Sequence, residues 1–273
     1  MLKEFDVLFV VVLYQEHLLN TCTYKTLIAL NDSCDVFVYD NSTENQSSIK
    51  DIPSVVYYEH NPQNPGLSYA YNKAAEYADL KGYRMILLLD QDTTFREGAI
   101  DSYKKAIQEN AGIKLFCPAM MVEGSKFISP VKIYHHSTRL SDTVPKGQAS
   151  TSMYTAINSG LLIDVKAFLS IGGYNEKVRL DYSDFQFFER FSEKYKEFFV
   201  VDMICNQSFS AQVQNSSQKL RRFEIFCECL KNCEKKSLLD KIDYQYIVLK
   251  RAINLCLQTK TIKPLIIYTN KYL

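Results

Sequence analysis

The sequence predicts an α/β fold with a doubly wound, mostly parallel sheet flanked by helices, followed by a helical extension at the C-terminal end. Two observations carry this prediction. Apolar runs of strand length alternate with helix-like stretches over the first 120 residues, and the runs are unbroken, as is typical of parallel strands covered on both faces. The last stretch, 219–273, has a different charge balance, with 12 Lys/Arg against 5 Asp/Glu, whereas 1–218 hold 20 against 26.

The first half of the chain supplies the predicted strands and helices in alternation. The strands are expected at 6–13, 35–40, 55–60 and 85–90. A helix is expected within 16–31 and another within 66–83, where alanines and aromatic residues recur on one helical face and Gly82 marks the end. Thr93 and Thr94 are then expected to cap a helix whose buried stripe is Ile100, Tyr103 and Ile107.

The second half continues with shorter elements. Asn158 to Gly160 open a strand, Asp164 is expected to cap a short helix at 165–171, and two glycines follow it. An aromatic helix is expected after Asp184. These elements complete a domain predicted to span 1–218.

The extension at 219–273 reads as amphipathic helix. Its apolar faces are predicted to contain Phe223, Phe226, Leu230, Ile242, Tyr246, Leu249 and Ile253. Two interpretations stay open: the helix packs on its own domain, or it lies on an anionic membrane surface.

Composition excludes several classes of protein. A net charge of +1 gives no basis for a nucleic-acid partner. The eight cysteines lack histidines at zinc-site spacing, so they are expected to be reduced structural thiols. The first apolar run, Val7 to Leu13, is too short to span a bilayer and lacks the marks of a signal peptide. We therefore expect a cytoplasmic chain, with possible peripheral contact at the inner face of the cell membrane.

Polar residues follow three of the predicted strands. Asp40 and Asn41 end the second, the loop 61–68 follows the third, and Asp90 and Asp92 end the fourth. Each of these segments, taken singly, is compatible with an ordinary turn. Ligands of open α/β sheets bind outside the carboxyl ends of the strands, however, and all three segments fall on that edge.

The two aspartates suggest a metal site. Residues i and i+2 of an extended chain point the same way, so Asp90 and Asp92 are expected to share one side of the strand end. Mg²⁺ or Mn²⁺ takes hard oxygen ligands and completes its shell with water and substrate phosphates. Gly66 would allow close backbone approach, and the helix behind it would direct free N–H groups at the phosphates.

Asp184 is a candidate general base. It is expected in the first turn of its helix, where the helix dipole favours the ionised form that can take a proton from a hydroxyl. The alternative reading is a helix cap. Asp181, three residues earlier, is the competing carboxylate.

In order and spacing, these motifs resemble the family 2 glycosyltransferases of the GT-A fold, especially the rhamnosyltransferase-like branch of bacterial O-antigen and capsule synthesis. The resemblance covers about 5–210 and is carried by "VVVLY", "VYDNST", "NPGLSYAYN", "LLLDQDTTF", "NSGLLI", "GGYNE" and "DYSDFQFFER". It implies a GT-A domain with a nucleotide-sugar donor.

The resemblance also implies roles for matching positions. Asp90 and Asp92 correspond to the metal motif, with Asp92 as the direct ligand, and Asp184 corresponds to the catalytic base. The implied substrate-binding residues are Asp40, Asn41, Asn64, Gly66, Asn72, Asp90, Asn158 and Arg190. Two positions depart from the family: Gln186 replaces an acidic residue two after the base, and Gln207 stands where a metal-binding histidine is common.

The implied reaction is an inverting transfer of a sugar from a dTDP or UDP donor, with dTDP-rhamnose suggested by the "LDQDT" segment, to a hydroxyl of a growing glycan or lipid-linked glycan. Two rivals remain. A nucleotidyltransferase would carry a basic glycine-rich loop near its N-terminus, which "VVVLYQEHLL" does not resemble. A degenerate, non-catalytic nucleotide-sugar-binding protein would be compatible with Gln186 and Gln207.

Overall fold

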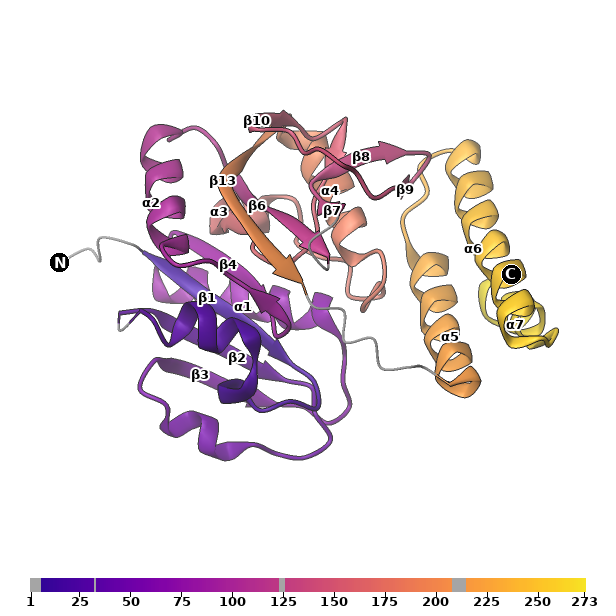
Figure 1. Ribbon diagram of the computed structural model, residues 1–273, viewed down its shortest axis with the longest axis horizontal. Helices are drawn as coiled ribbons and strands as arrows, with labels where there is room; N and C mark the ends of the chain where they lie inside the picture. Colours follow the sequence, from indigo (N-terminus) through magenta and orange to yellow (C-terminus); the bar gives the residue numbers. More distant parts are fainter. Residues whose placement is uncertain (1–5, 32, 123–125, 208–214) are drawn as a thin grey trace.

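The computed structural model describes residues 6–31, 33–122, 126–207 and 215–273, and within them it has the predicted α/β architecture (Figure 1). Ten described strands form one sheet. Its order is β10 (Gly147–Ser150), β13 (Glu197–Gln207), β6 (Leu115–Val122), β12 (Leu162–Asp164), β4 (Met85–Asp90), β1 (Val7–Leu13), β2 (Asp35–Asp40) and β3 (Val55–His60), with β5 (Thr93–Thr94) paired to β13 and β7 (Lys126–Ser129) to β6. A second, three-stranded sheet contains β11 (Tyr154–Thr155), β8 (Val131–Tyr134) and β9 (Ser137–Thr138).

Strands β4, β1, β2 and β3 are parallel, so their carboxyl ends meet at one edge of the sheet. The register places Asp40 opposite Leu13 and Asp90 opposite Val12. The strand-end residues singled out in the sequence therefore do lie along a common edge.

Side chains of β1 alternate between two hydrophobic cores. One face packs against α1 (Leu67–Lys81), α3 (Val165–Ser170) and α4 (Ser183–Lys194), and the other against α2 (Ala99–Glu109). Both faces of the central strands are thus covered, which explains why these strands read as unbroken apolar runs.

Several sequence predictions are confirmed in the helices. Helix α1 ends at Lys81, and Gly82 follows it in the left-handed conformation with φ of 80°. Asp164 caps α3, because its Oδ1 accepts a hydrogen bond from the Ala167 N–H at 2.9 Å. Helix α4 begins at Ser183, so Asp184 lies in its first turn.

The prediction of a helix within 16–31 is wrong in the type of helix. This segment forms a 3₁₀ turn at Leu18–Asn20 and a π-helical turn at Tyr24–Ile28. The end of β4 holds it in place: the Thr23 hydroxyl donates to the Asp90 carbonyl, and the Cys22 N–H donates to the Gln91 carbonyl at 3.0 Å. Contacts to a distant strand thus override the local helical pattern.

The predicted helix cap at Thr93 and Thr94 is also wrong. Both threonines form strand β5, in which Thr93 pairs with Gln207 and Thr94 with Asn206 of β13. Helix α2 begins only at Ala99, after Gly98 with φ of 72°. Its buried side is as predicted, with Ile100 and Tyr103 buried and Ile107 packed against the same core.

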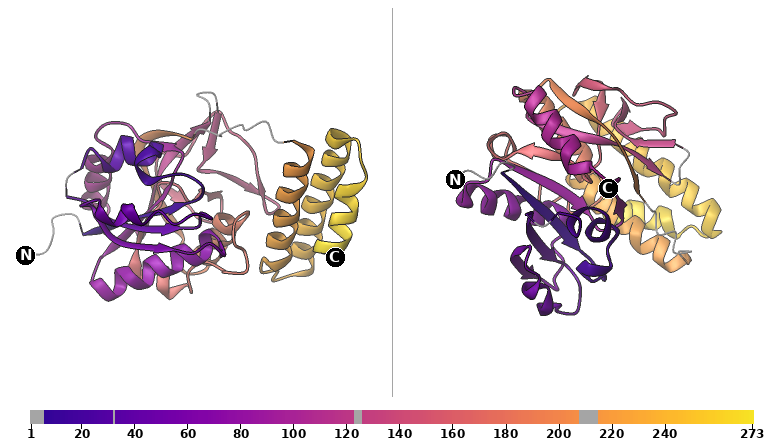
Figure 2. Two further views of the ribbon diagram at one scale, coloured as in Figure 1. Left: turned by 90° about the horizontal axis from the view of Figure 1, so that it is seen from below. Right: turned by 60° about the vertical axis from the view of Figure 1, so that its left-hand side comes forward.

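The C-terminal extension contains α5 (Ser216–Asn232), α6 (Leu238–Thr259) and α7 (Lys263–Ile267), side by side at one end of the molecule (Figure 2). The predicted boundary at 218/219 falls inside α5. A third hydrophobic core joins these helices to Val178 of the main domain. No helix in the described ranges is long and apolar enough to cross a membrane.

The apolar faces predicted for the extension divide into two groups. Phe223, Phe226 and Leu230 are buried, as helix packing predicts. On α6, however, the buried side chains are Tyr244, Val248 and Ala252, and the predicted apolar residues Ile242, Tyr246 and Ile253 are 53%, 62% and 47% exposed. Helix α6 therefore carries one apolar face inward and a second one outward.

Candidate functional site

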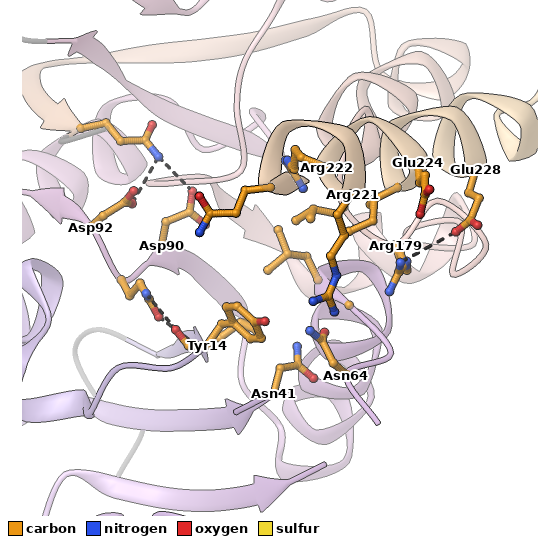
Figure 3. Close-up of a pocket in the computed structure, with 18 residues that line it drawn as sticks. Tyr14, Asn41, Asn64, Asp90, Asp92, Arg179, Arg221, Arg222, Glu224 and Glu228 are labelled. Atoms are coloured by element: carbon orange, nitrogen blue, oxygen red, sulfur yellow. Dashed lines mark hydrogen bonds and ion pairs between the residues drawn. The ribbon is translucent and has the colours of Figure 1, made fainter. Parts of the chain in front are cut away.

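A cavity of about 750 Å³ opens at the carboxyl edge of the sheet (Figure 3). The sheet and its loops contribute Tyr14, Asn41, Asn64, Gly66, Asp90, Asp92 and Gln207. The opposite wall comes from Arg179 and from Gln218, Arg221, Arg222, Glu224, Ile225 and Glu228 of α5, so it holds three arginines and two glutamates. The cavity thus lies between the main domain and the first helix of the extension.

A second cavity, of about 340 Å³, adjoins the first. Both cavities are lined by Leu67, Asp90, Leu180, Gln207 and Arg222, and the second adds Asn158, Asp181 and Asp184. Asp90 therefore stands where the two cavities meet. This arrangement gives room for two molecules whose reacting atoms meet near Asp90.

Gln207 lies beside the predicted metal motif. Its Nε2 donates to Asp92 Oδ1 at 3.3 Å and to Asp90 Oδ2 at 3.5 Å, both drawn in Figure 3. Burial, and secondly the charge of Asp92, raise the pKa of Asp90 to about 7. Burial also raises the pKa of Asp92. The two carboxylates thus share one neutral amide, which relieves their repulsion only in part.

Residues around Asp90 fix its position. The Tyr71 hydroxyl donates to Asp90 Oδ1 at 3.2 Å, and the Asp90 N–H donates to the Ser159 hydroxyl at 3.2 Å. That hydroxyl is in turn hydrogen-bonded to the Thr93 hydroxyl at 2.7 Å. Ser159, in the "NSGLLI" motif, is therefore a supporting residue of the site.

This oxygen-rich pair fits a hard divalent cation. Burial pushes both carboxylates toward protonation, and the charge of Asp92 adds to this effect at Asp90. A bound cation would restore the ionised form of both. Among the residues whose positions are described, no group of three or more His, Cys, Asp or Glu side chains is placed to hold a metal ion. A cation bound here would depend on substrate phosphates for further ligands.

Asp184 and Asp181 occupy different environments. Asp181 forms an ion pair with Arg222 of α5 at 2.8 Å. Asp184 has no ion pair with any described cationic side chain, and its Oδ1 accepts from the N–H of Phe185 at 2.7 Å. Burial, with a smaller contribution from Asp181, raises the pKa of Asp184 to about 6. A carboxyl in a cavity with a pKa near neutrality is suited to general-base chemistry.

Asn41, rather than Asp40, faces the larger cavity. Asp40 is fully buried behind the wall, where its oxygens accept from the Ser42 N–H and the Tyr58 hydroxyl, both at 2.9 Å. Asn41 lines the cavity, and its buried Oδ1 has no hydrogen-bond partner in the structure. An acceptor left unpaired at a cavity wall is available to a ligand donor.

Gly66 lines the cavity, but the close approach it permits is to protein. A side chain there would collide with the Arg179 carbonyl oxygen, and the Leu67 N–H already donates to that oxygen at 2.8 Å. The Leu67 N–H is therefore not one of the helix N–H groups left free for an anion. The close contact brings Arg179 to the cavity in its place.

Asn158 lines the smaller cavity and braces it. Its Oδ1 accepts from the Tyr174 hydroxyl at 2.7 Å, and its Nδ2 donates to the Ser183 hydroxyl at 3.3 Å. These bonds connect the segment before β12 to the loop after α3 and to the first turn of α4, which carries Asp184.

Three of the singled-out side chains are engaged away from both cavities. Asn72 donates to the Tyr174 carbonyl and accepts from the Tyr174 N–H, so it fixes the loop after α3. Arg190 donates to the Gly173 carbonyl at 3.0 Å and pairs with Glu234. Gln186 is buried, and its Oε1 accepts from Asn175 at 2.8 Å. The geometry gives each of them a bracing contact.

The cationic wall of the larger cavity was not found from the sequence. Arg179 lies 3.8 Å from Glu228, and Arg222 is held by Asp181. Arg221 has no ion pair with a described residue and extends from α5 toward Asn64, across the cavity from Asp90 and Asp92 (Figure 3). The only sequence signal was the adjacent arginine pair at the start of the basic extension.

Known proteins resemble this chain in sequence and in fold. The chain is 26% identical over 179 residues to the dTDP-rhamnosyl transferase RfbF of Shigella flexneri, a match covering 64% of this chain and 59% of that protein. The mannosyltransferase PcManGT of Pyrobaculum calidifontis, solved with GDP-Man and Mn²⁺, has a TM-score of 0.58 at 14% identity, covering 98% of this chain and 86% of that one. GalNAc-T7, solved with UDP, GalNAc and Mn²⁺, has a TM-score of 0.57 at 12% identity, covering 93% and 57%.

The solved structures share the GT-A fold with this chain, which confirms the fold predicted from the sequence. The model of the family described as "Glycosyltransferase like family 2" matches residues 13–240, which include both cavities and the beginning of α6. The chain belongs to the glycosyltransferase 2-like family.

Proposed function

We propose that this protein is an inverting glycosyltransferase, which moves a sugar from a nucleoside diphosphate to a hydroxyl of a growing surface polysaccharide or lipid-linked glycan. One observation carries the proposal: Asp184, the candidate base, and Asp90, of the candidate metal motif, line the same cavity, and that cavity adjoins a larger one whose wall carries three arginines. We assign the larger cavity to the donor and the smaller one to the acceptor hydroxyl.

The donor cavity offers a partner for each part of a nucleoside diphosphate. The unpaired Oδ1 of Asn41 would accept an N–H of the base, and the half-exposed ring of Tyr14 would stack on it. Arg221 and Arg179 would contact the diphosphate, because arginine binds phosphate oxygens strongly and directionally. Asp40, which is buried behind the cavity wall, would contribute indirectly by holding the loop that carries Asn41.

Asp90 and Asp92 would hold Mg²⁺ or Mn²⁺, with Asp92 as the more accessible ligand. A divalent cation at this position would supply positive charge to the departing diphosphate. Gln207 would then face the cation, in place of the histidine that the family often has. The Mn²⁺ in PcManGT and GalNAc-T7 supports this assignment for related folds.

The chemistry needs one displacement. Asp184 takes the proton of the acceptor hydroxyl as its oxygen attacks the anomeric carbon, from the face opposite the leaving group. The new glycosidic bond forms as the bond to the diphosphate breaks, and Arg221 and Arg179 stabilise the leaving group. Asn158 and Tyr174 keep the first turn of α4 in place beneath this step.

A rhamnosyl donor on dTDP is our first assignment, because the curated relative is named a dTDP-rhamnosyl transferase. UDP-hexoses come second. The rival reading, a non-catalytic nucleotide-sugar-binding protein, draws on Gln207, which already occupies the hydrogen-bonding positions of both aspartates. Gln186 no longer supports that rival, since it lies in the protein interior and not in either cavity.

A thermal-shift panel tests the proposal directly. The full chain is melted with dTDP-rhamnose, UDP-glucose, UDP-GalNAc or GDP-mannose, each with and without Mn²⁺. A ligand at 100 times its Kd adds about 2.7 kcal/mol of stability, so the true donor should raise Tm by several degrees with metal present. The same donor should then be hydrolysed slowly when no acceptor is added. Binding without any hydrolysis would favour the non-catalytic protein, and no shift with any donor would contradict both readings.

A further inference from the structure

A third cavity, of about 380 Å³, lies on the small sheet formed by β11, β8 and β9. Lys132 and Tyr134 are two residues apart on β8, and Tyr154 of β11 is the cross-strand partner of Lys132. The three side chains therefore share one face of the sheet. The segment 139–145 forms the facing wall.

This cavity adjoins the acceptor cavity. Arg139 and Leu140 line both of them. A chain of sugars with its reacting hydroxyl beside Asp184 would pass Arg139 and reach the small sheet. The facing wall is fixed in place, because Ser141 exchanges two backbone hydrogen bonds with Phe127, at 2.8 and 3.0 Å.

The lining suits a sugar that carries a negative charge. The ring of Tyr134 is 47% exposed, and tyrosine rings present an apolar face that can stack on the C–H face of a pyranose. The Arg139 guanidinium lies 5.7 Å from the centre of that ring. Lys132 and Arg139 form no ion pair with a described carboxylate, and the Asp142 carboxylate, in the facing segment, is 3.6 Å from Lys126 instead.

We propose that Lys132, Tyr134, Arg139 and Tyr154 form a remote acceptor subsite, which binds a sugar unit bearing a carboxylate or phosphate, farther along the acceptor chain than the unit that receives the new sugar. The inference that its ligand belongs to the acceptor rests on the proposed function. The inference that a binding site for an anionic sugar exists does not depend on the proposed function.

The binding test uses saturation-transfer NMR on the full chain with two matched probes, methyl β-D-glucuronide and methyl β-D-glucoside. The glucuronide should give the stronger signal, and Tyr134→Ala or Lys132→Ala should reduce it about fivefold or more, as the loss of one stacking or charged contact predicts. Tyr246→Ala, at an exposed tyrosine of α6, is the control and should leave the signal unchanged. Saturating UDP with Mn²⁺ should not displace the glucuronide.

Equal signals from the two probes would show that the site has no preference for a negatively charged sugar, against the proposal. An unchanged signal in both Tyr134→Ala and Lys132→Ala, displacement by UDP, or no binding of either probe would overturn the subsite. A second arm applies once an acceptor polymer is in hand: Tyr134→Ala should raise KM for the polymer, with donor hydrolysis at the wild-type rate. A chain that binds the glucuronide as predicted but transfers no sugar would refute the proposed function and leave the subsite standing.

Discussion

Gln207 Nε2 lies 3.3 Å from Asp92 Oδ1, so the carboxylate expected to bind a metal already has a protein partner. The partner is an amide, which is a weaker metal ligand than the carboxylate or imidazole groups that hold such ions in proteins. It also bonds Asp90 at 3.5 Å and so spans the whole motif. Metal affinity in this protein should therefore depend on residue 207.

Gln207→His should strengthen Mn²⁺ binding by about tenfold, equivalent to about 1.4 kcal/mol, because an imidazole nitrogen adds a better ligand to the two carboxylates. The measurement is the Mn²⁺ concentration that gives half-maximal donor hydrolysis. Gln91→His is the matched control, since Gln91 bonds the Tyr14 backbone and not the carboxylates. Equal strengthening by both variants, or by neither, would contradict a cation between Asp90 and Asp92.

Asp92→Ala should abolish metal-dependent donor binding and leave the fold intact. Folding raises the pKa of Asp92, so the ionised carboxylate is less favourable in the folded protein than in the unfolded chain. Replacing Asp92 by alanine should therefore not lower the free energy of unfolding at neutral pH. Calorimetric titration of a nucleoside diphosphate with Mn²⁺, beside a melting curve, makes the comparison. A variant that binds as tightly as the wild type shows that the site has been misassigned.

Asp184→Asn should turn over at least about a hundredfold more slowly, the usual cost of losing a general base, and should bind donor normally. Asp181→Asn is the matched control three residues away. Asp181 lines the same cavity, but its carboxylate is held by the ion pair with Arg222, so the activity of this variant should fall by much less. Sugar transfer by the two purified variants, with their melting curves, decides between them. The mechanism fails if Asp184→Asn stays active.

The rate of transfer should depend on pH through Asp184. A base must be ionised, and burial raises the pKa of this carboxyl to about 6. The rate should thus be level above that pH and fall about tenfold for each pH unit below it. Metal affinity should decline below about pH 7 as Asp90 takes up a proton, so the profile is measured at saturating Mn²⁺. If the residual activity of Asp184→Asn shows the same inflection, the inflection belongs to another group.

The extension should bind anionic membranes through the outer face of α6. Leu239, Ile242, Tyr246, Ile253 and Leu257 are exposed along this helix, and the extension carries an excess of Lys and Arg. The full chain should sediment with phosphatidylserine vesicles, and a double variant, Ile242→Glu with Leu257→Glu, should stay in solution. The alternative is a protein partner on this face: equal sedimentation of both chains, or of neither, removes the membrane role.

The sequence by itself determined the fold class and much of the candidate site. Unbroken apolar runs identify strands that are covered on both faces, and parallel strands bring their carboxyl ends to one edge, so Asp90 and Asp92 were predictable from strand ends alone. The position of Asp184 in the first turn of α4 was also predictable from a local signal, the aromatic helical segment that follows it. Periodicity and capping act within a few residues, and such features can be read along the chain.

Tertiary structure alone decided the partners across the cavity. The family resemblance had marked Gln207 as standing at a metal-ligand position, but its hydrogen bond to Asp92, 115 residues earlier in the chain, depends on the pairing of β13 with β5. Arg221 reaches the donor cavity because α5 folds back against the main domain, although its charge pattern had marked it as part of a separate extension. Long-range contacts also explain why 16–31 forms short 3₁₀ and π-helical turns and why Thr93 and Thr94 form a strand. Local helical preferences are worth only fractions of a kcal/mol per residue, so packing between distant segments outweighs them.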